Sequence, residues 1–427
     1  MKKIIQGTFA TSHGVEQQRV TFDESSEVIL EISAPNNLPA DYSFDQDCLI
    51  FMSPGDVHIH AREDASGKHK YKEDFASASL AAINGGLTHL CDMPNNPEAP
   101  INDESYLKKL SLAAKAIVPI LPYAGIGPET KPLSFKVPYK AYMGPSVGDL
   151  FFKTLDDLDR VLENYRGQWV SFHCEDPEIL ESHKGASGHL ARRPADAEVV
   201  ATKAALNFIR KYELKGKLCH YSAGDGLPLI LEAKKAGVQV TCEVTPQHLY
   251  FSSKNIPKER EIYFQMNPPI RHESDRAALL KALKNGDIDF LATDHAPHSK
   301  EEKEKGTSGL TGLDTYGPFM TWLLLEQKVT PQILAKVVAE NPGKFVSEFL
   351  PTFKQFHDRY HKFGIGPGFL KVGAWASFSI LDLKTPVTIS KEMLKTKCGH
   401  SPFEGIQFPG SVRQLVLGGK RFDALPL

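Results

Sequence analysis

Alternating apolar and polar residues, or short β-branched blocks, mark both ends of the chain. Six such stretches occur: 2–9 (KKIIQGTF), 15–23 (VEQQRVTFD), 26–33 (SEVILEIS), 376–383 (ASFSILDL), 385–390 (TPVTIS) and 411–419 (SVRQLVLGG). A period of two residues predicts strands with one buried face. We expect the two terminal groups of strands to pair into one small β-sandwich. The alternative is two unrelated terminal tails.

The middle of the chain, residues 51–365, has a different pattern, in which apolar strand-like runs alternate with amphipathic helical stretches. Helices are predicted at 73–86, 103–117, 196–212 and 274–286. Repeated β–α alternation over about 300 residues predicts an α/β fold with a parallel sheet, and at this length a (β/α)₈ TIM barrel. The predicted division is a sandwich part at 1–50, the barrel at 51–365 and a second sandwich part at 366–427.

Two segments carry metal-ligand residues at predicted strand ends. DVHIHARED (56–64) places His58 and His60 two residues apart, so both imidazoles of a strand point to the same face. Asp294 follows directly after the apolar run DFLATD. Two histidines and a carboxylate suit zinc. The alternative for the pair alone is a strand with two partly buried histidines.

Further candidate ligands end other apolar runs. His173 ends WVSFH, and His220 follows KLC. Lys140 lies inside the aromatic, apolar run FKVPYKAYMG, where an ammonium is costly to bury. A CO₂-derived carbamate on this lysine, bridging two metal ions, removes that cost. The alternative is a lysine that reaches the surface or pairs with a carboxylate. In a barrel, these residues fall at the C-terminal mouth, where such folds keep their chemistry.

From about residue 50 to the C-terminus the chain resembles the dihydroorotases of the amidohydrolase superfamily. The segments that carry the resemblance are HIHAR (58–62), GGLTHLCDMPNN (85–96), YKAYMGPS (139–146), LCHYSA (218–223), TCEVTPQHL (241–249), NPPIR (267–271), TDHAPHSKEEK (293–303) and GLTGLDT (309–315). The resemblance implies a metal centre of two Zn²⁺, or other divalent ions, held by His58, His60, carboxylated Lys140, His173, His220 and Asp294.

The resemblance also implies a reaction and a substrate site. The reaction is the reversible cyclisation of N-carbamoyl-L-aspartate to dihydroorotate, with Asp294 as general acid and base. The substrate carboxylate is expected at Arg62, Asn95 and His298, the ring amide at Asn267, and the pyrimidine edge at the backbone near Gly312. The ordinary alternatives are a salt bridge for Arg62, a turn cap for Asn95 and a loop cap for His298.

Some positions depart from the family pattern or leave alternatives open. One bacterial branch has an aspartate bridge in a DDG-type segment in place of the lysine. This chain has no such segment and fits the lysine type better, although NPPIR resembles that branch. Gln247 stands where many relatives have histidine, and we interpret His89 and His248 as structural. Animal relatives with similar LCH and CEV segments suggest that Cys219 and Glu243 bind a third zinc ion beside His173. The alternative is that Cys219 packs in the core.

Rival functions within the superfamily are allantoinase and dihydropyrimidinase, and a different class is a non-catalytic scaffold subunit. The first two lack the arginine of HIHAR (Arg62) together with the histidine of HAPH (His298). Scaffold homologues lose metal ligands, whereas this chain keeps all six. GPS at 144–146 fits a mobile flap over the site or a plain loop.

Composition narrows the compartment and the partners. The 427 residues are 41% hydrophobic and 24% charged, as in soluble globular proteins, with net charge −2 and therefore no basic footprint for nucleic acid. Apolar runs fall short of the roughly 20 residues that a membrane helix needs, and MKKIIQGTFATSHG lacks the apolar core of a signal peptide. Six scattered cysteines predict the reducing cytoplasm. The resemblance leaves open a homodimer and an aspartate carbamoyltransferase partner.

Overall fold

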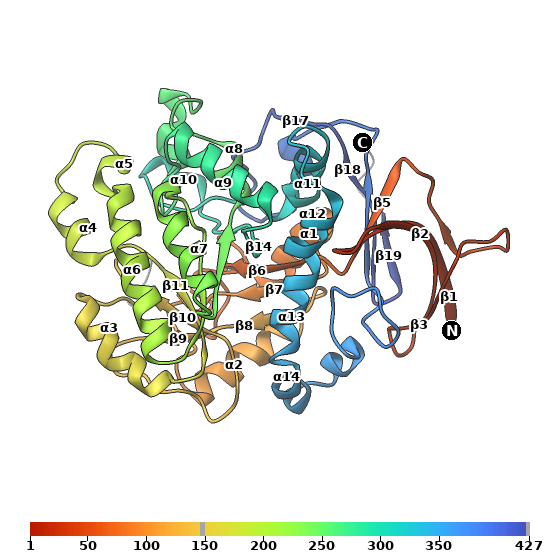
Figure 1. The fold of residues 1–427 in the computed structure, drawn as a ribbon, viewed down its shortest axis with the longest axis horizontal. Coiled ribbons are helices and arrows are strands. Elements are labelled where there is room, and N and C mark those ends of the chain that lie inside the picture. The colour runs from red at the N-terminus through yellow and green to blue at the C-terminus, as the bar shows by residue number, and fades with distance from the viewer. Residues whose placement is uncertain (146–149, 424–427) are drawn as a thin grey trace.

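Strands from the two ends of the chain meet in one eight-stranded sheet. The computed structural model describes residues 1–145 and 150–423, and Figure 1 shows the N-terminal strands beside the last strands of the chain. The order is β19-β18-β15-β5-β1-β2-β3, with β4 paired to β1. The strands are β1 Lys2–Ala10, β2 Val15–Asp23, β3 Val28–Ser33, β4 Tyr42–Ser43, β5 Cys48–Met52, β15 Phe378–Asp382, β18 Ser411–Leu417 and β19 Lys420–Asp423.

The join between the terminal segments is the antiparallel pair β5–β15, in which Ile50 lies opposite Ile380. The sheet is strongly curled. Three strand spacings separate β2 from β15, about 14 Å in a flat sheet, yet the ring centroids of Phe22 and Phe378 are 5.4 Å apart. The curl encloses an apolar core that also contains Phe9 and Val20. The pairing of the two termini agrees with the sequence prediction.

The middle of the chain forms two parallel sheets. One has the order β6-β7-β8 and the other β14-β13-β12-β11-β10-β9. Only Tyr123 separates β8 from β9, and a parallel bridge joins Ile59 to His295 at the other side. The strands are β6 Gly55–Ile59, β7 His89–Asp92, β8 Ile120–Pro122, β9 Ala124–Ile126, β10 Tyr139–Tyr142, β11 Trp169–His173, β12 Lys215–Leu218, β13 Val240–Val244 and β14 Phe290–Leu291.

Helices alternate with these strands and lie outside them (Figure 1). All four helices predicted from the sequence are present, as α1, α2, α6 and α9. Side-chain caps fix the starts of α1 and α2, where Asp74 and Asn102 each form a capping box with the serine three residues on. The α-helices are α1 Phe75–Asn84, α2 Asp103–Ala113, α3 Leu155–Leu162, α4 Pro177–His183, α5 His189–Arg192, α6 Ala195–Lys211, α7 Leu227–Lys235, α8 Pro246–Tyr250, α9 Glu273–Asn285, α10 Lys300–Glu304, α11 Tyr316–Leu325, α12 Pro331–Ala335, α13 Asn341–Ser347 and α14 Leu350–Phe356.

Between β15 and β18 the chain leaves the terminal sheet. The strands β16 (Val387–Thr388) and β17 (Gln407–Phe408) form a separate hairpin. The segment 391–404 inside this hairpin lies against loops of the parallel sheets. The amide of Lys397 and the hydroxyl of Thr396 donate to the buried carboxylate of Glu73. The 385–390 stretch, predicted as part of the terminal sandwich, therefore belongs to this excursion.

The composition of the charged run KEEKEKG (300–306) predicts a solvated loop, but the structure differs. It contains the helix α10, and Lys303 is buried. The Lys303 ammonium donates to the backbone oxygens of Gln265, Thr307 and Gly309 at 3.0, 2.9 and 2.8 Å. A lysine that satisfies three carbonyls is tolerated in the interior because each of its protons has an acceptor.

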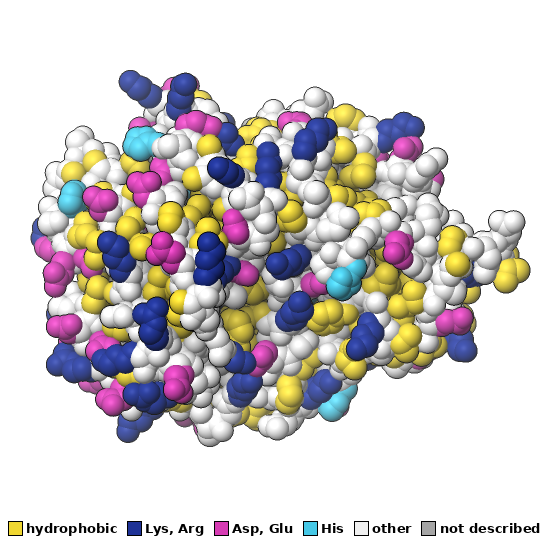
Figure 2. All heavy atoms as spheres, viewed as in Figure 1, with side chains coloured by type: hydrophobic (Ala, Val, Ile, Leu, Met, Phe, Trp, Pro, Cys, Tyr) yellow, Lys and Arg dark blue, Asp and Glu magenta, His cyan; other side chains and the backbone are white. Residues whose placement is uncertain are grey.

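The outer surface carries mixed charge. Figure 2 shows lysine and arginine side chains intermingled with aspartate and glutamate over the helical face of the molecule. Within residues 1–145 and 150–423, no helix has the length and apolar character needed to cross a bilayer.

The aromatic core of the terminal sheet gives a test of the fold. Phe378 is fully buried between Phe9 and Phe22. We expect Phe378→Ala to lower the free energy of unfolding by roughly 3–5 kcal/mol, because it removes a ring and leaves a cavity. Urea denaturation measures the change. Leu30→Ala, at an exposed position of β3, is the control; equal effects of the two substitutions contradict the described packing.

Candidate metal centre and substrate site

The six predicted ligands gather at the carboxyl ends of the parallel strands. His58 lies in β6 and His60 just beyond it, His173 ends β11, and Lys140 lies in β10. His220 and Asp294 follow the ends of β12 and β14 by two and three residues. All six side chains are buried. Parallel strands bring such residues together because their carboxyl ends share one edge.

The first group of ligands is His58, His60 and Asp294. The Oδ1 atom of Asp294 lies 3.2 Å from His58 Nε2 and 3.1 Å from His60 Nε2. Two ligand atoms held tetrahedrally by one zinc ion are about 3.3 Å apart. The donor atoms of this group are therefore spaced as they are around a single ion, and the three side chains form a metal-ligand cluster.

The second group is His173 and His220, whose Nδ1 and Nε2 atoms are 3.0 Å apart. Its position beside the first group follows from the rings of His58 and His220, whose centroids lie 5.2 Å apart. The two groups together offer nitrogen and oxygen donors on two sides of one small volume, which fits two neighbouring ions.

Lys140 belongs to the same volume. Its side chain is fully buried, and its Nζ atom has no hydrogen-bonded oxygen or nitrogen partner within the described part of the chain; the groups beside it are the Cys219 thiol and the Tyr142 ring, whose centroid is 5.2 Å away. The Lys140 charge lowers the pKa of His58, His173 and His220 in addition to the effect of their burial. An unsatisfied buried ammonium among histidines is unfavourable, so this amine fits the site only with a further ligand or modification.

Burial sets the protonation of the ligands. It lowers the pKa of His58, His60 and His220 well below the ordinary value. Neutral imidazole is the form that binds metal. Burial also raises the pKa of Asp294 to about 7, although the neighbouring Lys140 charge lowers it.

Three site residues have left-handed backbone conformations. The φ angles of Arg62, His220 and Asp294 are 62°, 36° and 47°. Non-glycine residues rarely adopt such angles, and strained residues of this kind cluster at functional sites. The turn at His220 changes the strand alternation, so that His220 reaches the ligand cluster although its neighbour Cys219 continues the strand.

Buried acceptors fix the orientation of the histidines. Glu243 Oε1 lies 2.6 Å from His58 Nδ1, and Asn95 Oδ1 lies 2.6 Å from His60 Nδ1. In both cases Nδ1–H donates, which leaves Nε2 unprotonated toward Asp294. Partners of this kind orient metal-binding histidines and raise their basicity.

His173 is held from the opposite ring atom. Its Nε2–H donates to Glu175 at 2.8 Å. The Arg193 guanidinium also donates to Glu175, with Nε 3.0 and 3.1 Å from the two oxygens. Burial raises the pKa of Glu175, but Arg193 and His173 outweigh it and hold that pKa below its usual range. The ionised carboxylate leaves His173 Nδ1 toward His220.

The predicted substrate clamp is assembled beside His60. Arg62 Nη2 lies 3.2 Å from His298 Nε2, and Arg62 Nε donates to the Pro297 carbonyl at 3.3 Å. Asn95 contacts His60, as described above. The three clamp residues Arg62, Asn95 and His298 are thus brought to one side of the first ligand group. The alternative role for Arg62 was a salt bridge, but within the described residues Arg62 makes no ion pair.

Asn267 and Gly312 are less directly placed. Asn267 Oδ1 is buried without a hydrogen-bond partner among the described residues. The Gly312 amide donates to His295 Nδ1 at 3.2 Å. A Cβ at Gly312 would lie 2.8 Å from Thr293 Cβ, so only backbone fits there. The roles of both residues in substrate binding stay predictions.

In the structure, the histidine beside the proposed third-zinc ligands Cys219 and Glu243 is His58. The ligand atoms of Cys219 and Glu243 lie within 4.8 Å of one another and of a ring nitrogen of His58. His173, which the sequence placed beside them, uses its second nitrogen on Glu175 instead. Lys217 also forms a buried ion pair with Glu243.

Other residues of this region were not identified from the sequence. Lys217 carried the same signal as Lys140, a lysine in an apolar strand, and Asp56 adjoins the first histidine motif. Asp56 accepts from the backbone amides of His58 and Thr293 at 3.0 and 3.1 Å, and burial raises its pKa to about 7. The contact of His295 with Glu73, at 3.2 Å, joins residues 222 positions apart and left no local signal.

His248 and Gln247 make structural contacts. His248 Nε2 donates to the Pro268 carbonyl at 3.1 Å, and Gln247 Nε2 donates to the Thr311 carbonyl at 3.1 Å. The interpretation of residues 144–146 as a flap stays a prediction, since Ser146 lies outside the described residues.

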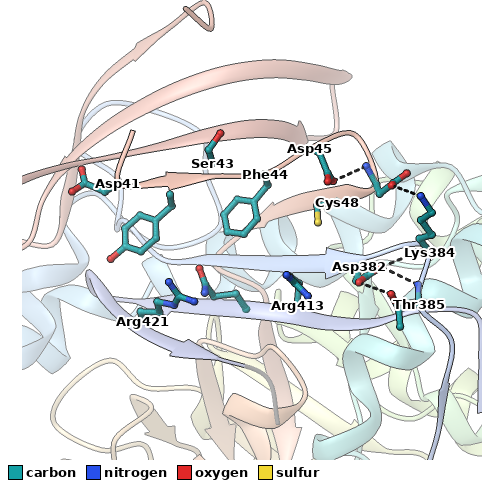
Figure 3. Close-up of a pocket in the computed structure, with 13 residues that line it drawn as sticks. Asp41, Ser43, Phe44, Asp45, Cys48, Asp382, Lys384, Thr385, Arg413 and Arg421 are labelled. Atoms are coloured by element: carbon teal, nitrogen blue, oxygen red, sulfur yellow. Dashed lines mark hydrogen bonds and ion pairs between the residues drawn. The ribbon is translucent and has the colours of Figure 1, made fainter. Parts of the chain in front are cut away.

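A polar pocket of about 470 Å³ lies elsewhere, between the Asp41–Cys48 segment and the strands β15, β18 and β19 (Figure 3). Its carboxylates serve the local backbone. Asp41 accepts from the Ile4 amide at 2.8 Å, and Asp382 accepts from the amides of Lys384 and Thr385 at 2.8 and 2.9 Å. The carboxylates Asp41 and Asp382 of this pocket therefore hold neighbouring backbone segments in place.

Similar proteins were found by sequence. A dihydroorotase of Pyrococcus furiosus is 30% identical over 430 residues, which cover 98% of this chain and 92% of the relative. A dihydroorotase of Shouchella clausii is 32% identical over 399 residues, 87% of each protein. One from Staphylococcus aureus is 30% identical over 400 residues, covering 87% of this chain and 88% of the relative. No protein-family model matches the chain.

Solved structures similar to this one establish the fold. L-hydantoinase (dihydropyrimidinase) from Arthrobacter aurescens superimposes with a TM-score of 0.85 at 23% identity, over 98% of this chain and 95% of that one. Dihydropyrimidinase from Brevibacillus agri NCHU1002 gives 0.81 at 20% identity, over 99% and 95%. The mixed α/β fold is therefore that of the hydantoinases.

Proposed function

Because the chain belongs to the dihydroorotase family, we propose that it interconverts N-carbamoyl-L-aspartate and (S)-dihydroorotate, a step of de novo pyrimidine biosynthesis. The observation that carries the proposal is the contact of Arg62 with His298 beside the His58–His60–Asp294 group. A cation at that place suits a substrate that bears a carboxylate as well as a cyclic amide.

Because the fold is shared with the hydantoinases, the alternative function is that of an allantoinase or a dihydropyrimidinase. Allantoinase and dihydropyrimidinase act on cyclic amides that lack the carboxylate. A buried arginine serves no such substrate and costs free energy to desolvate. Arg62 is 3% exposed, which favours dihydroorotase over these alternatives and over a non-catalytic scaffold.

We propose that His58, His60, His173, His220, Asp294 and a carboxylated Lys140 hold two divalent ions, with zinc as the first choice. Support comes from the donor spacings within the two ligand groups and from the Lys140 amine, which has no hydrogen-bonded oxygen or nitrogen partner among the described residues. Carboxylation of Lys140 replaces a buried cation by an anion that can bridge two ions. Ions held there supply Lewis acidity and an activated water.

The residues of this chain have separate tasks in the proposed reaction. Asp294 accepts a proton from the attacking water and returns it to the leaving amide nitrogen, so one carboxylate acts as base and then as acid. Arg62, Asn95 and His298 hold the substrate carboxylate and so fix the position of the reacting carbonyl. Hydrolysis creates a carboxylate and releases a proton, so alkaline pH favours ring opening and acidic pH favours cyclisation.

We further propose that the two parallel sheets form one (β/α)₈ barrel at 51–365. The Ile59–His295 bridge and the short break at Tyr123 support it. The curled terminal sheet then forms the small β-sandwich from 1–50 and 366–427, with 391–404 returning to the barrel mouth. All six cysteines are free, which supports a cytoplasmic location. A homodimer or an aspartate carbamoyltransferase partner is compatible with this proposal.

Substrate choice tests the proposed function. We expect purified protein to hydrolyse dihydroorotate in preference to hydantoin, dihydrouracil and allantoin. Chelation should remove the activity, and Zn²⁺ should restore it, because the proposed centre supplies the activated water. Faster turnover of hydantoin or dihydrouracil favours dihydropyrimidinase. Inactivity with all four substrates after Zn²⁺ loading favours the scaffold alternative.

The carbamate is tested at its lysine. We expect Lys140→Ala to lose activity and bound metal, and we expect bicarbonate or a short carboxylic acid to restore part of the activity by replacing the bridge. Lys136→Ala, at an exposed lysine of the same segment, is the control. Full activity of Lys140→Ala without any addition refutes the bridge.

The clamp and the proton carrier should separate kinetically. We expect Arg62→Met to weaken dihydroorotate binding by roughly 2–5 kcal/mol, since a desolvated charge pair is lost, and so to raise KM. Asp294→Asn should retain binding and lower kcat about 10²–10⁴-fold. Steady-state kinetics and inhibitor binding measure both effects. An unchanged KM in Arg62→Met shows that the clamp is misassigned.

A further inference from the structure

A second buried cation lies beneath the ligand cluster. Lys217 is fully buried in β12, and its ammonium forms an ion pair with Glu243 Oε2. It also lies 3.5 Å from the Val57 carbonyl and over the rings of Tyr123 and Phe290, at 5.6 and 5.9 Å from their centroids. Lys217 thus lies in the interior of the parallel sheets, between β6, β13, β14 and Tyr123, the residue that separates β8 from β9.

The other oxygen of Glu243 contacts the ligand histidines. Oε1 accepts from His58 Nδ1 at 2.6 Å and from the His220 amide at 2.9 Å. Glu243 is itself fully buried. A buried carboxylate requires a compensating charge, and Lys217 supplies it from the side opposite to His58.

Without Lys217 this place has the composition of a metal site. His58, Cys219 and Glu243 offer an imidazole, a thiol and a carboxylate within 4.8 Å of one another, a donor set that zinc accepts. Cys219 lies two residues after Lys217 and so shares its strand face. Cys219 is 1% exposed, and it faces the cluster although it also packs in the core.

A divalent ion and the Lys217 ammonium compete for the same carboxylate. Two cations bound to one buried carboxylate repel strongly in a medium of low polarity. A metal ion at this place also needs His58 Nδ1 as a ligand, and so displaces the proton that Nδ1 donates to Glu243. Only one of the two arrangements is compatible with the observed contacts.

We propose that the Lys217 ammonium is the resident cation of the His58–Cys219–Glu243 cluster, where it excludes a divalent ion and keeps Glu243 on His58. Lys217 is in this respect a positioning residue. The inference rests on the proposed metal centre in one respect: His58 belongs both to the His58–His60–Asp294 group and to the His58–Cys219–Glu243 cluster.

Zinc stoichiometry tests the inference. Lys217→Met keeps the size of the side chain and removes its charge. After equilibration with excess Zn²⁺ and desalting, we expect this variant to retain one zinc ion per chain more than the unaltered protein, and Lys217→Met/Cys219→Ser to lose that additional ion. Lys109→Met removes another buried lysine, which pairs with Asp92, and should add no zinc.

Cobalt provides an optical readout of the same site. We expect Co²⁺ to produce a thiolate-to-cobalt charge-transfer band in Lys217→Met, and none that depends on Cys219 in the unaltered protein. Cys219→Ser in the unaltered background should leave the zinc content the same, because Lys217 already fills the cluster.

Two results overturn the inference. One is equal zinc content in Lys217→Met and the unaltered protein. The other is the loss of a zinc ion or a cobalt band on Cys219→Ser alone, which shows that a metal occupies the cluster despite Lys217. If Lys217→Met does not fold, Lys217→Gln replaces it as the variant without the charge, and Cys219→Ser independently tests whether a metal ion occupies the cluster. An unaltered protein that binds no zinc refutes the binuclear proposal, while the difference between variants still tests Lys217.

Discussion

The carboxylate of Glu243 links two of the proposed ligand histidines to a buried lysine. One oxygen meets the ring of His58 and the backbone of His220, and the other meets Lys217. These contacts join β6, β12 and β13 in a region that water does not reach. The positions of two ligand histidines therefore depend on one acidic side chain, and the charge of that side chain depends on one lysine.

Charge balance explains the composition of the region around it. Apolar strands supply the packing, but their carboxyl ends bring histidines, carboxylates and lysines into one small volume. Each of these groups is unfavourable there by itself. Pairs such as Glu175 with Arg193 make burial tolerable and also set ring orientation. Among the described residues Lys140 differs from Lys217 and Lys303, because its amine has no carboxylate or carbonyl partner.

Local periodicity was sufficient to predict the main elements. The four amphipathic stretches are helices, and the two ends of the chain share a sheet. Several ligand candidates could be identified because they end apolar runs, and Lys140 because it lies inside one; the family resemblance completed the set. The interactions around them could not, because they join distant residues: His58 with Glu243 across 185 positions, and His295 with Glu73 across 222. For the same reason the sequence associated Cys219 with His173, whereas the structure groups it with His58. The left-handed turn at His220 could not be predicted from its residue type.

The segment 391–404 supports the site from a part of the chain that follows the parallel strands. Its residues bond to the carboxylate of Glu73, and His400 Nε2 donates to the carbonyl of His298 at 2.8 Å. A growing polypeptide on the ribosome can form the parallel strands long before residue 400 is added. It has every ligand residue by then, but the loop that carries His298 still lacks its outer support. The loop that carries His298 therefore gains this support only after residue 400 has been added.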